Sequence, residues 1–540
     1  MPSSPTDTFA RDRLPPPQRM PTLLFGLPDL QRLPERLNCA GALLDRWVAQ
    51  GQGDRPCVFG TAPDGTPIRW TYADLQREAN RIARVLVDDL GVVPGHRVLL
   101  RGANSPMLAA CWFAVVKAGA IAVGTMPLLR ARELTTIVHK AQITHALCDA
   151  RLAEELKLAL PQCPTLQHVL HFNRGALEEA ALLKPAEFQN ADSAADDTCV
   201  IAFTSGTTGQ PKAAMHFHRD VMAAAACWPP HVLRAVPDDV VIGSPPLAFT
   251  FGLGGLLVFP LSIGASTVLV EKATPDALPA AIAAYRATIC YTSPTAYRAM
   301  AGNLAGQDLS SLRKCVSAGE ALPAATRQLW QDTTGIRIID GIGSTEMFHI
   351  FISATEEQAR GGATGYVVPG YEAQILDDAG QPLPPGKVGR LAVRGPTGCK
   401  YLDDERQTTY VQNGWNLTGD AYLIDPADGQ FVYQARTDDM IISGGYNIAG
   451  PEVESALLLH PAVAECGVIG VADAERGQIV KAFVVLKAGH AGDEAMVKTL
   501  QDFVKQTVAP YKYPRAVEFR ATLPRTETGK LQRFRLRQEG

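Results

Sequence analysis

Residues 199–212 read Cys-Val-Ile-Ala-Phe-Thr-Ser-Gly-Thr-Thr-Gly-Gln-Pro-Lys, an apolar run followed at once by hydroxyls, glycines and a lysine. The apolar half, residues 199–203, has the pattern of a buried strand. The second half suits a loop that binds a polyphosphate, because glycine lets backbone N–H groups approach an anion closely and Lys212 adds positive charge. A plain Gly/Ser/Thr surface turn is the alternative. The hydroxyls and the terminal lysine favour phosphate binding.

The loop differs from the common P-loop, in which G-x-x-x-x-G-K-[ST] opens a helix. Gln210 and Pro211 separate Gly209 from Lys212, and neither Ser nor Thr follows the lysine. The loop also lacks the Rossmann dinucleotide pattern. It therefore predicts a bound nucleotide without predicting kinase or GTPase chemistry.

Composition sets the class of protein. The chain has 540 residues, 46% hydrophobic and 20% charged, which is typical of a soluble globular protein with several domains. Its net charge of −4 gives no global positive field, so we expect neither nucleic acid nor membrane as a partner. Eleven cysteines with no C-x-x-C pair favour buried thiols in a reducing, cytoplasmic compartment over disulfides or a zinc site.

Two segments resemble targeting or membrane sequences only superficially. Residues 1–21 lack the apolar core of a secretory signal. Residues 240–270 carry no charge and are long enough to span a bilayer, but prolines and glycines interrupt them. We interpret this stretch as buried core with a turn that lines a pocket.

Helical and strand-like segments alternate through residues 37–340, as in parallel βα units. Near residue 370 the pattern changes to short strands with tight turns, which predicts a small antiparallel β subdomain. A smaller βα block follows Arg436. The predicted helices are 75–88, 107–118, 452–459 and 495–507, and the predicted strands include 97–101, 120–124, 146–148, 240–243, 266–270, 288–292, 314–318 and 337–340.

Three further clusters place polar groups on expected loops. Residues 341–346 offer the Glu346 carboxylate after two hydroxyls, hard oxygen ligands for Mg²⁺, or else a strand-to-helix turn with Ser344 as N-cap. Asp420 can accept hydrogen bonds from a ribose diol, or can belong to an Asx turn. Lys530 ends a polar loop and can neutralise charge in a site held by another domain, or can be part of a solvated tail.

Histidines supply one more pattern. His216 and His218 would share a face if both lay in a strand, which would permit metal binding. No third ligand is evident in the sequence nearby, so satisfied or surface histidines are the favoured interpretation. His349 lies just past Glu346 and could face the same pocket.

Together, the loop at 204–212 and the clusters at 341–346, 415–420 and 523–530 resemble one family, the adenylate-forming enzymes, which include acyl- and aryl-CoA ligases, peptide-synthetase adenylation domains and luciferases. Their order, spacing and chemistry agree over roughly residues 37–533. The resemblance implies an α/β fold with a large N-terminal domain of two doubly wound βα subdomains plus a small β-barrel subdomain, hinged to a small α/β C-terminal domain. The expected boundaries are an N-terminal extension at 1–36, the N-terminal domain at 37–435, a hinge at 436–439 and a mobile C-terminal domain at 440–540.

The resemblance also implies ATP, Mg²⁺ and coenzyme A as ligands and gives residues their roles. Lys530 would contact the substrate carboxylate and α-phosphate, Thr345 the α-phosphate, and Glu346 the Mg²⁺ ion. Asp438 would be the hinge. The backbone at Gly444, Gly445 and Tyr446 would meet the pantetheine arm after the C-terminal domain rotates. The other expected ATP or AMP contacts are Thr204, Ser205, Gly206, Thr207, Thr208, Lys212, Ala318, Gly319, Glu320, Asp340, Gly341, Asp420 and Arg436. Of these, Ala318, Gly319 and Glu320 belong to residues 317–320, which resemble the adenine-binding stretch of the family.

The sequence departs from the family pattern at three positions. Ala213 and Ala435 stand where glycine is usual, and Ile342 stands where a tyrosine commonly packs near adenine. None of these changes removes a charged residue. They put in doubt the details of adenine packing rather than the activity.

Within the family, residues 246–254, 344–351 and 511–515 are most similar to benzoate- and 2-aminobenzoate-CoA ligases. Phe249 and Phe251, flanked by glycines, could wall a flat apolar slot for a ring, or could be plain core. Ser344 or His349 could accept a hydrogen bond from an ortho-amino group. The expected aryl-site residues are Phe249, Phe251, Gly252, Gly343, Ser344 and His349.

We therefore expect an AMP-forming ligase that couples an aromatic carboxylate to coenzyme A through an aryl-adenylate, as a monomer or homodimer. Three alternatives remain at this stage. The acceptor could be the phosphopantetheine of a carrier protein, the acid could be another small carboxylic acid, or the chain could be a non-catalytic nucleotide-binding relative.

Overall fold

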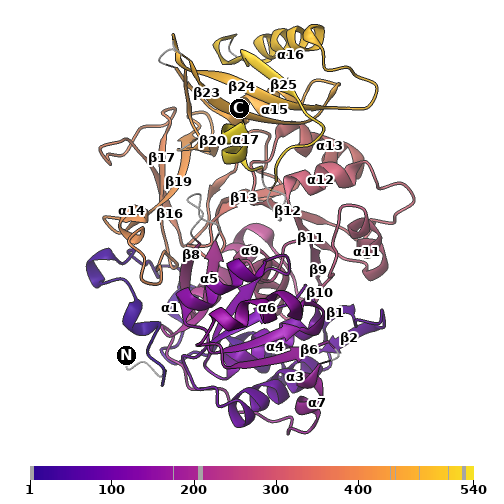
Figure 1. The fold of residues 1–540 in the computed structure, drawn as a ribbon, viewed down its shortest axis with the longest axis vertical. Helices are drawn as coiled ribbons and strands as arrows, with labels where there is room; N and C mark the ends of the chain where they lie inside the picture. The colour runs from indigo at the N-terminus through magenta and orange to yellow at the C-terminus, as the bar shows by residue number, and fades with distance from the viewer. Residues whose placement is uncertain are drawn as a thin grey trace.

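The computed structural model describes residues 5–173, 175–204, 211–437, 439–443, 446–473, 475–508, 510–525 and 531–539. Figure 1 shows two large sheets in the N-terminal part of the chain, with the C-terminal residues forming a separate layer at one end. The structure is α/β with an additional antiparallel β subdomain, as the sequence predicts.

A six-stranded sheet carries the quoted stretch. Its strand order is β6-β5-β3-β4-β7-β8, parallel except for the β7–β8 pair, which is antiparallel. The strands are β3 (Arg97–Arg101), β4 (Ile121–Thr125), β5 (His145–Asp149), β6 (His168–Phe172), β7 (Thr198–Thr204) and β8 (Lys212–Phe217).

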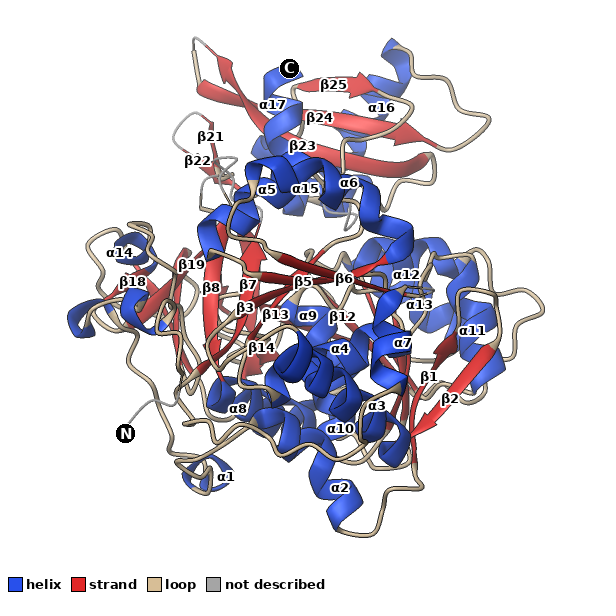
Figure 2. Cartoon of the chain, turned by 60° about the horizontal axis from the view of Figure 1, so that its bottom comes forward, coloured by secondary structure: helices blue, strands red, loops and turns tan. Residues whose placement is uncertain are grey.

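Helices cover both faces of this sheet (Figure 2). Helices α3 (Tyr72–Arg84) and α4 (Pro106–Lys117) share a core cluster with Val98 and Leu100 of β3. Helices α5 (Ala131–Ala141) and α6 (Ala153–Ala159) pack with Leu99 on the opposite face. Because successive strand residues point to opposite faces, β3 contributes side chains to the cores on both faces of the sheet. Its three central residues are therefore all apolar.

Helix α3 begins at Tyr72, three residues before the predicted start. Thr71 and Asp74 form a capping box in which the Asp74 N–H donates to Thr71 Oγ1 at 3.1 Å and the Thr71 N–H donates to the Asp74 carboxylate at 3.0 Å. These side chains satisfy N–H groups that a helix start otherwise leaves unpaired.

A nine-stranded sheet forms the second large layer, in the order β15-β14-β13-β12-β11-β9-β10-β1-β2. Strands β13, β12, β11, β9, β10 and β1 run parallel to one another, and the strands at both edges are antiparallel. The strands are β1 (Pro56–Thr61), β2 (Pro67–Thr71), β9 (Val240–Gly243), β10 (Ser266–Val268), β11 (Ile289–Thr292), β12 (Lys314–Ala318), β13 (Ile338–Gly343), β14 (Ile350–Ser353) and β15 (Tyr366–Val367). Helices α11 (Ala277–Tyr285), α12 (Pro294–Ala301) and α13 (Ala324–Thr334) flank it.

The uncharged stretch 240–270 is buried core, as predicted. Between β9 and β10 it forms three consecutive helical segments, α9 (Thr250–Leu253), a π-helical turn at Gly254–Val258 and α10 (Phe259–Ser262). Most of these residues are buried within the protein. Among the described residues, no helix has the length and apolar character needed to cross a membrane.

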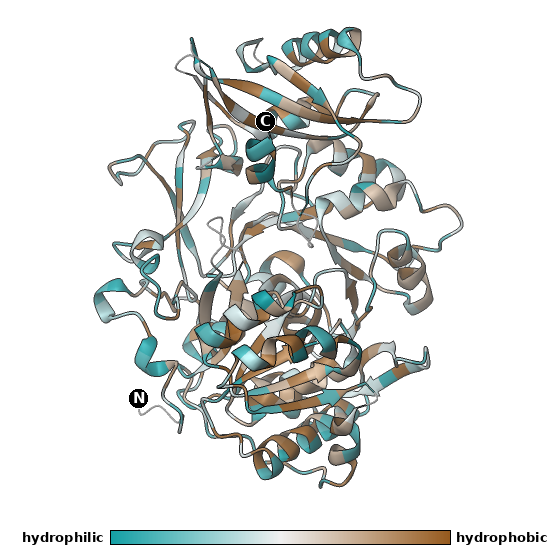
Figure 3. Ribbon diagram, in the orientation of Figure 1, coloured by the Kyte–Doolittle hydropathy of each residue, from teal (hydrophilic) through white to brown (hydrophobic). Residues whose placement is uncertain are grey.

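The predicted β subdomain is a five-stranded antiparallel sheet, and a third βα layer follows it. The subdomain comprises β16 (Glu372–Leu376), β17 (Gly389–Arg394), β18 (Val411–Gln412), β19 (Trp415–Ile424) and β20 (Phe431–Arg436). The C-terminal layer comprises β21 (Ile441–Ser443), β22 (Tyr446–Ile448), β23 (Val463–Asp473), β24 (Gly477–Leu486) and β25 (Ala516–Phe519), with α15 (Gly450–Leu457), α16 (Glu494–Thr507) and α17 (Arg533–Glu539). This layer has its own hydrophobic core, and Figure 3 shows hydrophobic residues along its long strands.

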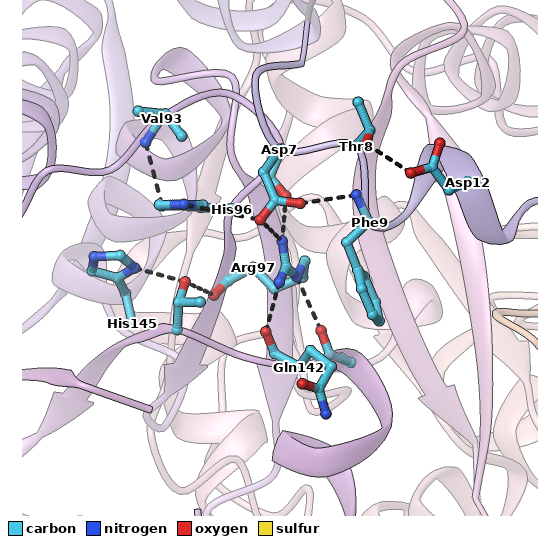
Figure 4. A network of polar contacts seen from close by, with 12 residues as sticks. Asp7, Thr8, Phe9, Asp12, Val93, His96, Arg97, Gln142 and His145 are labelled. Carbon is cyan, nitrogen blue, oxygen red and sulfur yellow. Dashed lines mark hydrogen bonds and ion pairs between the residues drawn. The ribbon is translucent and has the colours of Figure 1, made fainter. Parts of the chain in front are cut away.

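The N-terminal segment is tied to the six-stranded sheet by a buried arginine (Figure 4). Arg97, on β3 and only 3% exposed, donates to the Asp7 carboxylate at 2.6 Å. It also donates to the backbone carbonyls of Gly95, Ala141 and Gln142 at 3.0, 3.0 and 2.7 Å. Because a buried guanidinium is costly unless it is paired, this network fixes residues near Asp7 against the sheet.

Candidate active site

The parallel strands of the nine-stranded sheet bring the predicted motifs to one edge. Strands β9, β11, β12 and β13 are adjacent and parallel, so their carboxyl ends lie together. From these ends the chain continues into residues 244–249, 293–295, 319–320 and 344–349 respectively. In open α/β sheets this edge is where ligands bind. The predicted aryl, adenine and α-phosphate residues therefore share one region.

Strands β7 and β8 bracket the predicted phosphate loop. Thr204 and Lys212 face each other as the last register pair of this antiparallel hairpin. The loop thus joins two strands, whereas the common P-loop joins a strand to a helix. Its residues Ser205, Gly206, Thr207 and Thr208 lie outside the described residues, as do Gly209 and Gln210.

The segment Ser344–His349 is also a hairpin loop. Gly343 of β13 pairs with Ile350 of β14, and the Ser344 hydroxyl accepts a hydrogen bond from the Met347 N–H at 3.2 Å. The alternative of a strand-to-helix turn is wrong, because the chain reverses directly into β14; Ser344 caps a turn instead. Phe348 has a φ of +69°, an uncommon conformation for a residue other than glycine.

Two tyrosines, which the sequence analysis did not identify, connect the predicted phosphate and metal residues. Tyr401 is 1% exposed, and its hydroxyl donates a very short hydrogen bond to Glu346 Oε1. Burial, with the nearby Glu346 carboxylate, raises the pKa of Tyr401, so its hydroxyl remains a donor. The Tyr410 hydroxyl lies 3.2 Å from Ser344 Oγ, and its ring packs edge-on against Tyr401 with centroids 5.8 Å apart.

Lys212 completes this group. Its Nζ lies 5.4 Å from the Tyr401 ring centroid and 5.9 Å from that of Tyr410, both within the range of a cation–π contact. The ammonium therefore lies near the ring of the same tyrosine whose hydroxyl donates to the Glu346 carboxylate. Such an arrangement holds a cation and an anion close to each other, as a site for a metal–phosphate complex requires.

Glu346 is suited to bind Mg²⁺. It is 7% exposed and supplies hard carboxylate oxygens, which this ion prefers. The Tyr401 hydrogen bond fixes the orientation of the carboxylate. A metal at this position would take its remaining ligands from phosphate and water.

Asp420 and Arg436 lie side by side on β19 and β20, where they form a register pair. Arg436 Nη1 donates to Asp420 Oδ1 at 3.3 Å and to the Thr418 carbonyl at 3.0 Å. Gly419, which directly precedes Asp420, has a φ of +77°. A Cβ at this position would come within 2.7 Å of Arg436 Nη2. The glycine thus allows the guanidinium to pack against the turn.

The predicted adenine stretch, residues 317–320, begins on β12 and continues past its end. Ala318 is 7% exposed, and Gly319 follows with a φ of +89°. The Glu320 carboxylate accepts a hydrogen bond from Thr295 Oγ1 at 2.7 Å and lies 3.7 Å from Arg525 of the C-terminal layer. This contact links the two parts of the molecule at the predicted nucleotide site.

Asp340 and Gly341 lie on the neighbouring strand, β13, in register with Ser317 and Ala318. Burial raises the pKa of Asp340 to about 6, while the Arg327 guanidinium opposes the shift. A Cβ at Gly341 would come within 2.8 Å of the Ile350 side chain, so the backbone here is closely packed. Asp340 is thus a buried carboxyl whose pKa lies above its usual range.

His349 occupies an aromatic cluster. Its ring centroid lies 4.4 Å from Phe259, 5.5 Å from Phe251 and 5.7 Å from Trp228. Burial lowers the pKa of His349 to about 3, and the backbone of Phe251 opposes this shift only in part, so the imidazole is neutral at neutral pH. Within the described chain, neither ring nitrogen makes a hydrogen bond of ordinary geometry.

Close packing around His349 depends on small residues. A Cβ at Gly254 would come within 2.4 Å of the His349 ring, and one at Gly343 within 2.5 Å of its carbonyl oxygen. At Gly252 a Cβ would come within 2.1 Å of the Pro246 carbonyl oxygen. A larger residue at Gly254 would displace the His349 ring, while larger residues at Gly343 and Gly252 would clash with the backbone at His349 and at Pro246.

The two phenylalanines of the predicted aryl slot are in different surroundings. Phe251 contacts His349 and, at 5.9 Å, the Tyr291 ring. Phe249 instead lines an apolar cavity between α9 and the six-stranded sheet, whose lining includes neither Phe251 nor His349. Phe249 precedes Thr250, the first residue of α9, and Phe251 follows it. The two rings therefore point in different directions.

The predicted H-x-H pair does not share a strand. His216 is the penultimate residue of β8, whereas His218 is the first residue of helix α8 (His218–Trp228). Burial lowers the pKa of His216 to about 4, and its ring packs edge-on against Phe348. Both histidines are buried, so the surface alternative is wrong for each.

Several predicted residues lie outside the described residues: Asp438, Gly444, Gly445 and Lys530. The strand β22 begins at Tyr446. Arg525 and Leu531, on either side of the segment that contains Lys530, pair with each other.

Comparisons with known proteins agree with this geometry. The AMP-binding enzyme model matches residues 44–401, and the AMP-binding enzyme C-terminal domain model matches residues 452–530. The chain is 35% identical over 520 residues to a benzoate–CoA ligase of Thauera aromatica, covering 94% of this chain and 97% of that protein. It is 30% identical to a mitochondrial acyl-coenzyme A synthetase, ACSM3, of Mus musculus, covering 94% and 91%.

Two solved structures have the same fold. An anthranilate CoA ligase in complex with anthranoyl-AMP superposes with a TM-score of 0.90 at 36% identity, over 94% of this chain and 98% of that chain. A benzoate CoA ligase from Burkholderia xenovorans LB400 gives 0.84 at 32% identity, over 93% and 100%.

Proposed function

The chain belongs to the AMP-binding enzyme family and is an acid–thiol ligase of the acyl- or aryl-CoA class, and on that premise we propose that it activates an aromatic carboxylate, 2-aminobenzoate or benzoate, as an aryl-adenylate. The product would be the aryl thioester of coenzyme A, with AMP and pyrophosphate released.

The observation that best supports an aromatic substrate is a group of buried polar atoms, near Phe251, that lack ordinary hydrogen bonds. The Tyr291 hydroxyl and the Trp228 indole N–H are buried without a hydrogen-bond partner among the described residues, and the His349 nitrogens make no hydrogen bond of ordinary geometry there, although the Phe251 backbone approaches the ring. Unsatisfied buried polar groups are costly, and a site that retains them is suited to a ligand that supplies the missing partner. An aromatic ring with a polar substituent combines flat apolar faces with such a partner.

The mechanism assigns a separate task to each motif. Thr204 and Lys212, with the loop between them, would hold the β- and γ-phosphates, while Asp420 and Arg436 would hold the ribose. The acid carboxylate attacks the α-phosphorus and pyrophosphate leaves. Lys530 would offset the charge that builds on the phosphorus. Magnesium held by Glu346 would supply further charge neutralisation at the phosphates.

The second half-reaction needs no nucleophile from the protein. The coenzyme A thiolate attacks the acyl carbon of the adenylate, and AMP leaves. We propose that the C-terminal domain, residues 440–540, rotates about Asp438 between the two steps and brings Gly444, Gly445 and Tyr446 to the pantetheine arm. Lys530 would therefore act in the first step, and Asp438 would be the hinge of the movement between the two steps.

The nucleotide products test the reaction type. Incubating the protein with ATP, coenzyme A and 2-aminobenzoate should release AMP and pyrophosphate, whereas ADP would contradict the proposal. A panel of benzoate analogues, scored by AMP release, then ranks the acids. Replacing coenzyme A by a phosphopantetheinylated carrier protein tests the other acceptor.

Lys530→Ala separates the half-reactions. It should abolish acid-dependent pyrophosphate exchange into ATP and leave thioester formation from supplied aryl-adenylate largely intact. Equal loss in both assays would show that the assigned role is wrong. Gly444→Pro should have the reverse effect, because it alters only the proposed pantetheine segment.

A second class of acid is the alternative. The side chains around Phe249, which include Leu100, Trp112, Leu253 and Leu257, are apolar, but the cavity that they enclose has a volume of about 20 Å³, so an alkyl chain would have to widen it. Similarity extends to acyl-coenzyme A synthetases as well as to benzoate and anthranilate ligases. The acid panel should therefore include hexanoate and octanoate; turnover of these above benzoate would favour an aliphatic substrate.

A further inference from the structure

Two cysteines and a histidine from three distant segments meet in the core of the N-terminal domain. Cys39 begins the helical segment that continues through Gly41–Asp45, Cys199 lies on β7, and His218 is at the start of α8. Cys39 and Cys199 are 0% exposed and His218 is 1% exposed. The sequence spacing concealed this group, since 160 and 179 residues separate Cys39 from its two neighbours.

The three side chains direct soft donor atoms at one another. The Sγ atoms of Cys39 and Cys199 are 4.0 Å apart, and His218 Nδ1 is 3.3 Å from Cys39 Sγ. All three donor atoms lie within 4.8 Å of one another. We propose that this Cys39–Cys199–His218 cluster is a structural site for a soft, thiophilic cation, Zn²⁺ or Cu⁺.

The separations fit such an ion. Zinc–sulfur bonds are about 2.3 Å and zinc–nitrogen bonds about 2.0 Å, so an ion between two sulfurs tolerates a separation of up to about 4.6 Å. The observed Sγ–Sγ separation lies inside that limit. Two thiolates and one imidazole are also a donor set that selects zinc or copper over magnesium or calcium.

Charge is consistent with burial of the ion. Two thiolates neutralise a divalent cation, and a neutral group is far cheaper to bury than a charged one. The nearest buried charges already compensate each other, since Lys400 Nζ lies 2.8 Å from Asp220 Oδ2 with both side chains fully buried. Zn²⁺ would therefore leave the site neutral, whereas Cu⁺ bound by two thiolates would carry one net negative charge, so burial favours Zn²⁺ of the two ions.

Coordination would replace one existing hydrogen bond. The Cys39 N–H donates to His218 Nδ1 at 3.1 Å, which puts the ring proton on Nε2 and directs the Nδ1 lone pair toward Cys39. Nδ1 is therefore already the unprotonated nitrogen that a metal requires. The ion would connect the segment at Cys39 to the strand that leads into the predicted phosphate loop.

The test begins with the tag-free full-length chain, purified after growth with added zinc or copper. Elemental analysis after gel filtration should give one equivalent of metal per chain. Removal by a zinc chelator, or by a copper(I) chelator under reducing conditions, distinguishes the two ions. Loss of the ion should lower the midpoint of thermal unfolding, and its return should restore that midpoint.

Variants separate this site from adventitious binding. Cys199→Ala should reduce the metal content to background. Cys111→Ala, which removes a buried cysteine outside the cluster, should retain it. If Cys199→Ala does not fold, the cobalt-loaded wild type decides, since two thiolate ligands produce an intense charge-transfer absorption. Failure to bind any of these metals at stoichiometric concentration overturns the proposal, as does an intact mass showing a Cys39–Cys199 disulfide.

Discussion

At the scale of single residues, Tyr401 is the side chain whose role was least apparent in the sequence. It holds the Glu346 carboxylate and lies under the Lys212 ammonium. We predict that Tyr401→Phe lowers the rate of acid-dependent pyrophosphate exchange about tenfold to a hundredfold, because a hydrogen bond to a charged group contributes about 1.5–3 kcal/mol. It should also raise the Mg²⁺ concentration needed for half-maximal rate.

Tyr366→Phe provides the matched control for this prediction. The Tyr366 hydroxyl donates to a carbonyl in an exposed loop, at 3.2 Å from the Asp428 oxygen. Its loss should leave pyrophosphate exchange and the Mg²⁺ requirement unchanged. If Tyr401→Phe changed only thermal stability and not the Mg²⁺ requirement, Tyr401 would not position the metal ligand.

Tyr291 offers a test of substrate choice at the same scale. Its hydroxyl is buried and unpaired among the described residues, and its ring packs edge-on against Phe251. We expect Tyr291→Phe to lower kcat/KM for 2-aminobenzoate about tenfold, which is the effect of one lost hydrogen bond. The kcat/KM for benzoate should stay nearly unchanged. Steady-state kinetics with both acids measure the ratio. An equal effect on both acids would mean that the hydroxyl does not contact the ring substituent.

At the scale of elements, the helical segments after α9 fix the position of His349. Gly254→Ala would bring a methyl group within 2.4 Å of the imidazole and should force the ring to move. We predict a loss of stability of about 1–3 kcal/mol together with a lower kcat/KM for aryl acids. Gly302→Ala at the end of α12 is the control, because its nearest neighbour would be 3.6 Å away. Urea unfolding and kinetics of both variants decide whether packing of this segment controls the aryl site.

Strands β3, β5 and β6 together create a pH-sensitive element. His145 stacks between His96 and His168, with centroids 5.2 and 4.8 Å away, and burial lowers its pKa to about 4. The unfolded chain therefore binds a proton between pH 6.5 and 4 that the folded chain does not, so stability falls as pH falls through this range. The contribution is on the order of 3 kcal/mol at most.

His145→Gln should make the decline of stability with acidification less steep. The measurement is the free energy of urea unfolding from pH 7.5 to 4.5 for both proteins. His139→Gln is the control, because that histidine is exposed. Parallel curves for wild type and His145→Gln would show that the stacked histidine does not account for acid sensitivity.

Elements with local signals were predictable from the sequence, and contacts between distant segments were not. The strand at Arg97–Arg101 and the helix after Ser105 follow from apolar patterning and from an N-cap that lies within a few residues. The sequence at Ser344–His349 allows a helix start as one alternative, because a serine can cap either a helix or a hairpin turn. Tyr401 lies 55 residues from Glu346, so only the folded sheets bring the two together.

At the scale of the whole molecule, one contact reports how the two domains are arranged. Arg525 of the C-terminal layer lies 3.7 Å from the Glu320 carboxylate and 3.5 Å from Thr295 Oγ1, at the predicted adenine edge. It also pairs with Glu465 within its own layer at 2.9 Å. The guanidinium therefore bridges the domains at the base of the segment that contains Lys530.

Because Lys530 is proposed to act in adenylation, the Arg525 contact should matter for that step. We predict that Arg525→Gln slows pyrophosphate exchange by about threefold to tenfold, the effect expected of a partly exposed charge pair that sets a domain orientation. Thioester formation from supplied aryl-adenylate should change much less, since the domain is proposed to leave this position first. Higher ionic strength should reduce the difference between wild type and variant in the exchange assay.

Arg520→Gln is the control that isolates the bridge between domains. Arg520 pairs with Glu518 at 2.7 Å and with Glu539, both within the C-terminal layer, so its loss perturbs that layer without touching Glu320. If Arg520→Gln and Arg525→Gln slowed pyrophosphate exchange equally, general loosening of the C-terminal layer would explain both. If Arg525→Gln slowed both half-reactions to the same extent, the contact would be structural, and the arrangement of the domains seen here would not be specific to adenylation. A selective loss of exchange, reproduced by Glu320→Gln from the other side of the bridge, would identify this arrangement as the adenylating one.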